Sequence, residues 1–240
     1  MTLGVGSRPL AFALCAALSA TGSPAGSQPP AGEPTVCLGR PSAGALRNGR
    51  QLQARPYLRL KSGSEKRAWG HGILLQLLTR AARSAERAVP GSVALVGDLS
   101  ARQGGPLSGH ASHQAGRDAD VAFMVSDAHG RPVALEQFEH FGPDGRSVSN
   151  PDHFFDTYRN WLLLRDWLAD LRVAVTHVFV SAELRELLLD YGRASPEFAR
   201  LVPLAGTVLR AHPNHADHFH LRIACPTDQR AACVDGAPEP

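Results

Sequence analysis

The sequence has no run rich in lysine and arginine, although 25 basic residues against 22 acidic ones give a formal net charge of +3. Without such a run, a nucleic-acid partner is not indicated. Beyond the N-terminus, no apolar stretch approaches the ~20 residues that a membrane-spanning helix needs. No internal repeat is present. These absences favour one compact domain, for which 240 residues, 43% of them hydrophobic, are ample.

The first 25 residues predict a cleaved export signal. An early positive charge at Arg8 precedes an apolar run over Leu10–Leu18, which is too short to span a bilayer. Residues 26–36 are rich in Gly, Ser and Pro, which is typical of a flexible linker. We therefore expect a folded domain over residues 37–236, in a compartment outside the cytoplasm.

Cysteine is scarce, with four residues in the chain. Cys15 falls in the expected signal and would leave with it. In an oxidising compartment, Cys225 and Cys233 are near enough in sequence to close a short disulfide-bonded loop. The alternative is that both are free buried thiols. The sequence identifies no partner for Cys37.

Hydrophobic periodicity predicts both helices and strands. Apolar residues recur at helical spacing over residues 72–88 and 156–171, whereas short apolar or β-branched runs over 93–96, 121–125 and 173–180 favour strands. No regular βαβ period connects these elements. We therefore expect an α+β domain, built as a small antiparallel β-sheet with flanking helices and long loops.

The segment Gly109–Asp120 reads Gly-His-Ala-Ser-His-Gln-Ala-Gly-Arg-Asp-Ala-Asp and concentrates metal-binding side chains. In a helix, His113 and Asp120 would lie two turns or about 10 Å apart along the axis, too far for one ion. The glycines instead favour a loop that folds back and enters a strand near Asp118. Asp118 and Asp120 then share a strand face, so one carboxylate could bind a metal while the other holds a ligand histidine.

A second histidine segment occupies residues 215–220. The order His218-Phe-His220-Leu-Arg222-Ile alternates polar and apolar residues as a half-buried strand does. The two histidines would lie about 7 Å apart on one face, so one could bind a metal while the other acts on water or substrate. Two histidines, a carboxylate and an open position are typical of a catalytic zinc site. Zinc there lowers the pKa of water and polarises a scissile carbonyl.

The motif His-x6-Asp followed by His-x-His resembles the superfamily of lysostaphin-like endopeptidases, D-alanyl-D-alanine dipeptidases and hedgehog domains. The longer stretches Val96–Ser100, Gly104–Asp120 and Asp217–Pro226 resemble the penicillin-insensitive murein endopeptidases of the bacterial periplasm. The resemblance covers most of the chain. It implies a single zinc metallopeptidase domain that cuts the peptide cross-links of peptidoglycan, including bonds between D-alanine and meso-diaminopimelate. β-Lactams would find no serine nucleophile to acylate.

The resemblance also implies residue roles. The residues that match the family's metal-binding positions are His110, His113, Asp120 and His220. His215 and His218 match histidines that line the catalytic centre, with His218 as the general base or transition-state stabiliser and His215 assisting it. Asp152–His153 is the local candidate for a second metal site. Family members can carry a cysteine that would pair with Cys37, and this chain is expected to lack it.

Four other polar residues lie in or near the motifs, and three of them carry alternatives. Asp118 could support a ligand histidine or simply occupy a turn. Arg222 could bind a substrate carboxylate or pair with an acid, and Gln114 could bind substrate or stabilise its loop. His212 is expected to be a loop residue outside the metal site.

Three functions are compatible with these motifs. The first is a zinc murein endopeptidase, and the second a zinc D,D- or L,D-carboxypeptidase that trims murein peptides. The third is a noncatalytic, metal-binding cell-wall module. We favour the first because both water-handling histidines accompany the expected ligands. The expected partner is cross-linked peptidoglycan in the periplasm, without nucleic acid and without a stable membrane span.

Overall fold

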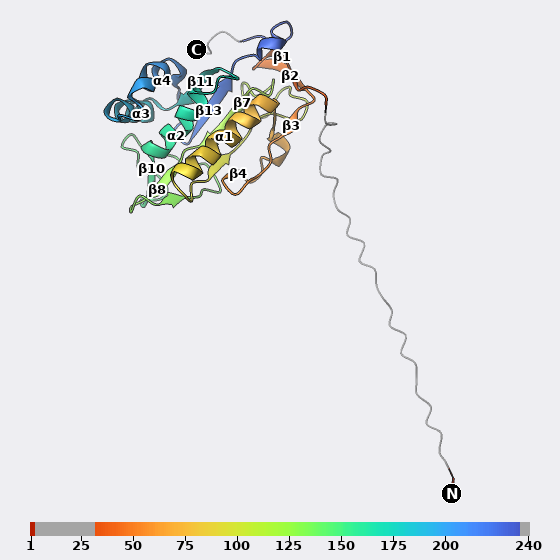
Figure 1. Cartoon of the computed structure of the whole chain (residues 1–240), viewed down its shortest axis with the longest axis horizontal. Helices are drawn as coiled ribbons and strands as arrows, with labels where there is room; N and C mark the ends of the chain where they lie inside the picture. Colours follow the sequence, from red (N-terminus) through yellow and green to blue (C-terminus); the bar gives the residue numbers. More distant parts are fainter. Residues whose placement is uncertain (3–31, 236–240) are drawn as a thin grey trace.

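The structure, a computed structural model, describes residues 1–2 and 32–235 (Figure 1). The expected export signal (1–25) and linker (26–36) lie largely outside these described residues, and both stay predictions. In the described part, no helix has the length and apolar character needed to cross a membrane.

The strands are β1 (Val36–Arg40), β2 (Ala43–Arg47), β3 (Arg50–Gln51), β4 (Leu58–Leu60), β5 (Trp69–Gly70), β6 (Ala94–Val96), β7 (Asp118–Ala122), β8 (Val125–Asp127), β9 (Pro132–Val133), β10 (His153–Phe155), β11 (Val175–Val180), β12 (Leu209–Ala211) and β13 (His218–Ile223). The helices are α1 (Gly72–Ala88), α2 (Thr157–Leu168), α3 (Ala182–Ala194) and α4 (Val202–Val208), with short 3-10 turns η1 (Glu65–Arg67), η2 (Ala199–Leu201) and η3 (Thr227–Gln229).

Six strands form the main sheet in the order β12-β11-β13-β7-β6-β4. Its centre is antiparallel, because β11 pairs with β13, β13 with β7, and β7 with β6 in that sense. The outer pairs β11–β12 and β4–β6 are parallel. The predicted α+β class is confirmed, but the sheet is mixed at its edges rather than purely antiparallel. Parallel pairs require long crossover connections. Helices α3 and α4 lie in the connection between β11 and β12 at one edge of the sheet, and α1 lies in the connection between β4 and β6 at the other edge.

Helix α1 matches its predicted bounds. The apolar residues at helical spacing, among them Leu74 and Leu78, are buried. His71 caps the helix, because its Nδ1 accepts a hydrogen bond from the Ile73 amide at 3.2 Å. The helix ends at Ala88, since proline at position 90 cannot continue it.

Helices α1 and α2 cover one face of the main sheet (Figure 1). Val121 of β7 and Phe219 and Leu221 of β13 are buried in the same core as Trp161 of α2. Full burial of such an apolar side chain contributes about 1.5–3 kcal/mol, so this face sets the orientation of both strands. The alternate residues of β7 and β13 consequently point to the opposite face, away from the helices.

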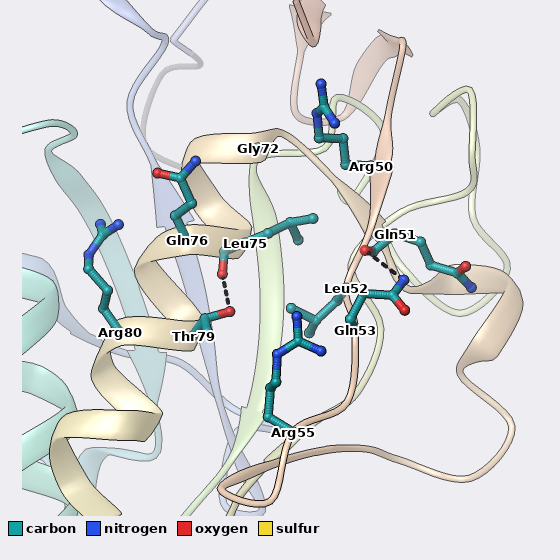
Figure 2. Close-up of a pocket in the computed structure, with 10 residues that line it drawn as sticks. All are labelled: Arg50, Gln51, Leu52, Gln53, Arg55, Gly72, Leu75, Gln76, Thr79 and Arg80. Atoms are coloured by element: carbon teal, nitrogen blue, oxygen red, sulfur yellow. Dashed lines mark hydrogen bonds between the residues drawn. The ribbon is translucent and has the colours of Figure 1, made fainter. Parts of the chain in front are cut away.

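A cavity of about 660 Å³ lies between α1 and the segment that contains β3 (Figure 2). Its wall includes Arg50, Arg55 and Arg80, together with Gln76 and Thr79 from the exposed side of α1. None of the histidines of the two motifs lines it. The residues that the sequence selects for chemistry therefore lie elsewhere, on the uncovered face of the sheet.

The disulfide between Cys225 and Cys233 is present, with Cα atoms 5.7 Å apart, and confirms the predicted bridge. Cys37 packs beside it as a free buried thiol, and burial raises its pKa to about 12. The bridged loop joins β1, because the Gly39 amide donates to the Ala232 carbonyl at 2.8 Å. The disulfide thus closes a loop after β13, and backbone hydrogen bonds join this loop to the first strand.

Replacing both Cys225 and Cys233 with alanine is expected to lower the free energy of unfolding by about 2–3 kcal/mol. The sequence separation is 8, and a loop of that size loses this much chain entropy when it is closed. Urea denaturation would measure the change. Reductant should produce a similar shift in the wild type and none in the double variant; equal midpoints for all samples would contradict the prediction.

Candidate metal centre

Strands β7 and β13 bring the two histidine segments together. They pair antiparallel, with His220 opposite Asp120 and Arg222 opposite Asp118. Because side chains alternate along a strand, these four polar residues share the face that the helices leave uncovered. The predicted strand and its polar face are confirmed.

The loop before β7 folds back over this face, as the glycines predicted. Gly116 has φ +70°, and a Cβ atom there would stand 2.7 Å from the Leu46 side chain, so only glycine fits. His113 is fully buried and also has a positive φ of 67°. A non-glycine residue in this conformation is uncommon and often marks a functional position. The His113 Nδ1–H donates to the Leu99 carbonyl at 2.6 Å, which leaves Nε2 free to face Asp120.

The Asp120 carboxylate lies at the centre of four imidazoles. Its Oδ1 is 3.3 Å from His113 Nε2, 3.5 Å from His220 Nδ1 and 3.6 Å from His218 Nε2. Its Oδ2 is 3.7 Å from His110 Nδ1. Donor atoms of His110, His113 and Asp120 all lie within 4.8 Å of one another. His218 and His220 lie about a hundred residues after Asp120 in the sequence, and the β7–β13 pairing brings them to it.

Two of these atoms are buried without a hydrogen-bond partner among the described residues, namely His113 Nε2 and Asp120 Oδ1. Leaving such an atom unsatisfied costs about 1–3 kcal/mol, which indicates that something else binds there. Imidazole nitrogens and a carboxylate oxygen are common ligands of divalent transition metals. The donor set therefore fits a metal ion.

In three of the histidines, the ring nitrogen that points away from Asp120 contacts another carboxylate. His220 Nε2 donates to Asp118 Oδ1 at 2.9 Å, and Arg222 Nε donates to the same oxygen at 2.5 Å. Asp118 is fully buried and Arg222 is 3% exposed. Of the two alternatives for each residue, the contacts favour support of a histidine for Asp118 and pairing with an acid for Arg222. This carboxylate–histidine arrangement is typical of metal ligands.

Two further carboxylates do the same for His110 and His218. His110 Nε2 lies 2.8 Å from Asp98 Oδ2, and His218 Nδ1 lies 2.6 Å from Asp217 Oδ1. Arg67 also pairs with Asp98 at 2.9 Å. No role was assigned to Asp98 from the sequence. The available signal was its position directly after a buried strand, at the start of the loop that carries His110.

Electrostatics at the centre favour an anionic Asp120 and a protonated His113. Burial would raise the pKa of Asp120, but the charge of His113, followed by those of His218 and His220, holds it well below its usual range. Burial would lower the pKa of His113, but the nearby Asp120 charge raises it to about 9. His113 is thus protonated at neutral pH unless a cation takes its place as the partner of Asp120.

The centre opens into a cavity of about 370 Å³. His215 lines it, with its ring centroid 5.0 Å from that of His218, and burial lowers the His215 pKa to about 4. His212 lies in the same wall, with Nδ1 3.0 Å from His215 Nδ1. Phe179 packs beside both rings, with its centroid 5.0 Å from that of His212 and 5.6 Å from that of His215. Sequence reasoning placed His212 outside the site; its spacing from His215 was the available signal.

Two remaining predictions concern residues outside the cavity wall. The backbone N–H of Gln114 donates to the Pro41 carbonyl at 3.0 Å, which stabilises the loop; the role of its side chain toward substrate stays a prediction. His153, the first residue of β10, has its Nδ1 2.8 Å from Oε2 of Glu139, which lies in the loop between β9 and β10. Asp152 and His153 are not part of the metal-type cluster that the described residues form.

Comparison with known proteins identifies the family. The sequence profile of a family described as penicillin-insensitive murein endopeptidase matches residues 37–240. A penicillin-insensitive murein endopeptidase of Yersinia enterocolitica is 29% identical over 84% of this chain and 73% of its own length. The namesakes in Haemophilus influenzae and Klebsiella pneumoniae are each 28% identical, over 74% and 83% of this chain and 58% and 71% of their own lengths. With a profile match over most of its length and a histidine–aspartate centre suited to a metal, this chain belongs to the penicillin-insensitive murein endopeptidase family of peptidases.

Proposed function

We propose that this chain is a zinc-dependent endopeptidase of the periplasm that hydrolyses the peptide cross-links of peptidoglycan, including D-alanyl–meso-diaminopimelyl bonds. The observation that carries the proposal is the convergence of four histidine nitrogens on the Asp120 carboxylate at the wall of a cavity. The relatives' shared name, murein endopeptidase, supports the substrate. The disulfide supports an oxidising compartment, as does the expected signal at residues 1–25 ahead of a domain at 37–236.

The proposed zinc ligands are His113, Asp120 and His220, with His110 as an additional ligand. Zinc is favoured because imidazole and carboxylate ligands with one open position are typical of catalytic zinc sites. The nitrogens available for binding are His113 Nε2 and Nδ1 of both His110 and His220, because the other nitrogens are engaged elsewhere. When bound, zinc supplies Lewis-acid chemistry that acidifies water and polarises a peptide carbonyl.

Side chains around the ion would orient ligands and move protons. Asp118 would keep the His220 ring in place through its 2.9 Å contact. His218 has Nδ1 engaged by Asp217, so its Nε2 could accept a proton from the attacking water and deliver it to the leaving nitrogen. His215, whose ring centroid lies 5.0 Å from that of His218, would assist by stabilising the charge that develops in the transition state. Because water attacks, no acyl-enzyme forms and a β-lactam has no nucleophile to acylate.

Digestion of cross-linked sacculi, followed by separation of the muropeptides, tests this function. Loss of cross-linked dimers with a matching gain of monomers is expected, together with loss of activity on chelation and its recovery with Zn²⁺. Release of terminal D-alanine alone would instead indicate a carboxypeptidase. Unchanged muropeptides with metal-loaded protein would indicate a noncatalytic module, and activity that survives thorough metal removal would exclude the zinc mechanism.

A further inference from the structure

Phe138 forms a wall beside the metal centre. Its ring stacks on the His218 imidazole, with centroids 4.9 Å apart and an interplanar angle of 19°. The ring also packs on the backbone of Gly97, where a Cβ atom would stand 2.4 Å from Phe138 Cζ. Glycine at this position therefore lets the ring approach the strand end that leads into Asp98. Phe138 thereby bridges the His218 side of the centre to the end of β6.

Lys61 contacts the Phe138 ring. Its Nζ lies 5.4 Å from the centroid of the Phe138 ring, within the range of a cation–π contact. Its Cε would lie 3.2 Å from a Cβ atom on Gly97, and its backbone amide donates to the Val96 carbonyl at 2.8 Å. The Lys61 side chain therefore lies against the same glycine and the same ring that flank the centre.

Unlike Arg59 and Arg67, Lys61 forms no ion pair with an acidic residue in the described part of the chain. Arg59 pairs with Glu136 at 2.7 Å, and Arg67 pairs with Asp98 at 2.9 Å. For Lys61, no carboxylate of the described residues lies within ion-pair distance, and its contact is with an uncharged ring. A positive charge that contacts the same ring as His218 is thus available to an anionic group of a substrate.

We propose that Lys61 binds the carboxylate next to the leaving nitrogen of the cross-link, with Phe138 positioning its ammonium. This inference rests on the proposed function. In a D-alanyl–meso-diaminopimelyl cross-link, the carbon that bears the scissile nitrogen also bears a carboxylate. His218 is the residue placed to protonate that nitrogen. Phe138 stacks on His218, and Lys61 in turn contacts Phe138. The carboxylate on the leaving side would therefore meet Lys61, which makes Lys61 a specificity-determining residue.

Two cross-linked muropeptide dimers test the proposal, one with this carboxylate free and one with it converted to a carboxamide. The wild type should cleave the free acid with a kcat/KM about tenfold or more above that of the amide, since a charged hydrogen bond is worth that much. Lys61→Met should lose this preference by cleaving the acid more slowly, while its kcat/KM for the amide stays unchanged. Lys61→Arg should retain the preference.

Lys66→Met is the matched control, because it removes the same side chain and charge from an exposed position in η1. It should cleave both dimers as the wild type does, and all variants should bind one metal ion per chain. Equal cleavage of acid and amide by the wild type, or an undiminished preference in Lys61→Met, would overturn the inference while leaving the function intact. If the wild type cleaves neither dimer, the proposed function fails and this inference fails with it.

Discussion

Replacing Asp118 with alanine is expected to lower the free energy of unfolding by about 3–5 kcal/mol, the typical cost of breaking a buried ion pair by removing one of its members. Asp118 is fully buried, and its Oδ1 accepts hydrogen bonds from both His220 and Arg222. Burial would raise the Asp118 pKa, but the hydrogen bond from His220 and the Arg222 charge hold it well below its usual range. The carboxylate is therefore charged, and its loss would remove the buried hydrogen bonds that it accepts from His220 and Arg222. Urea denaturation at neutral pH measures the change.

A surface aspartate provides the control for this experiment. Asp190 pairs with Arg193 on the exposed side of α3, and its side chain is 70% exposed. Asp190→Ala should change stability by no more than about 0.5 kcal/mol, because exposed ion pairs contribute little. If Asp118→Ala unfolds at the same urea concentration as this control, then the buried contacts do not stabilise the pairing of β7 with β13. Weaker metal binding by Asp118→Ala, by about 10–100-fold, is expected in addition because His220 loses its orienting partner.

Replacing His113 with alanine is expected to abolish tight metal binding and to reduce cross-link cleavage by about 10³-fold. The His113 Nε2 is a buried atom without a hydrogen-bond partner among the described residues, and it lies 3.3 Å from Asp120 Oδ1. Removing it takes one proposed ligand from the ion. The Lewis-acid contribution lost in this way is several kcal/mol, which corresponds to about that factor in rate. Metal content per purified chain and the muropeptide digest are the two measurements.

His129→Ala is a suitable control, because His129 is an exposed histidine in the turn after β8, away from the centre. It should retain one metal ion per chain and full cleavage. Circular dichroism would establish that His113→Ala remains folded, which matters because residue 113 has a positive φ of 67°. A folded His113→Ala protein that binds metal as tightly as the wild type would contradict the ligand assignment.

Local patterns predicted the parts of this molecule that depend on neighbours in sequence. The bounds of α1 follow from apolar residues at helical spacing and from the proline that ends it. The alternation in His218–Ile223 predicted a strand with a polar and an apolar face. The glycines at 109 and 116 predicted the fold-back of the loop that carries His113, since positive φ values are available to glycine at little cost. The short spacing of Cys225 and Cys233 predicted their disulfide.

Contacts between distant segments were harder to predict. The parallel outer pairs of the sheet depend on how α1, α3 and α4 pack, which no local period describes. The contact of Asp98 with His110, and the place of His212 in the cavity wall, also arise from separate segments. Lys61 and Phe138 meet across a glycine that neither residue neighbours in the sequence.

By itself, the sequence determined the residue types at the centre, their spacing within each segment and the family that they resemble. The tertiary structure decided that Asp120 lies among four histidines, which nitrogen of each histidine is free, and which carboxylate holds the other. The physical reason is that helical and strand periodicity report local burial. The register of β7 against β13, by contrast, results from packing Val121, Phe219 and Leu221 against helices from other parts of the chain.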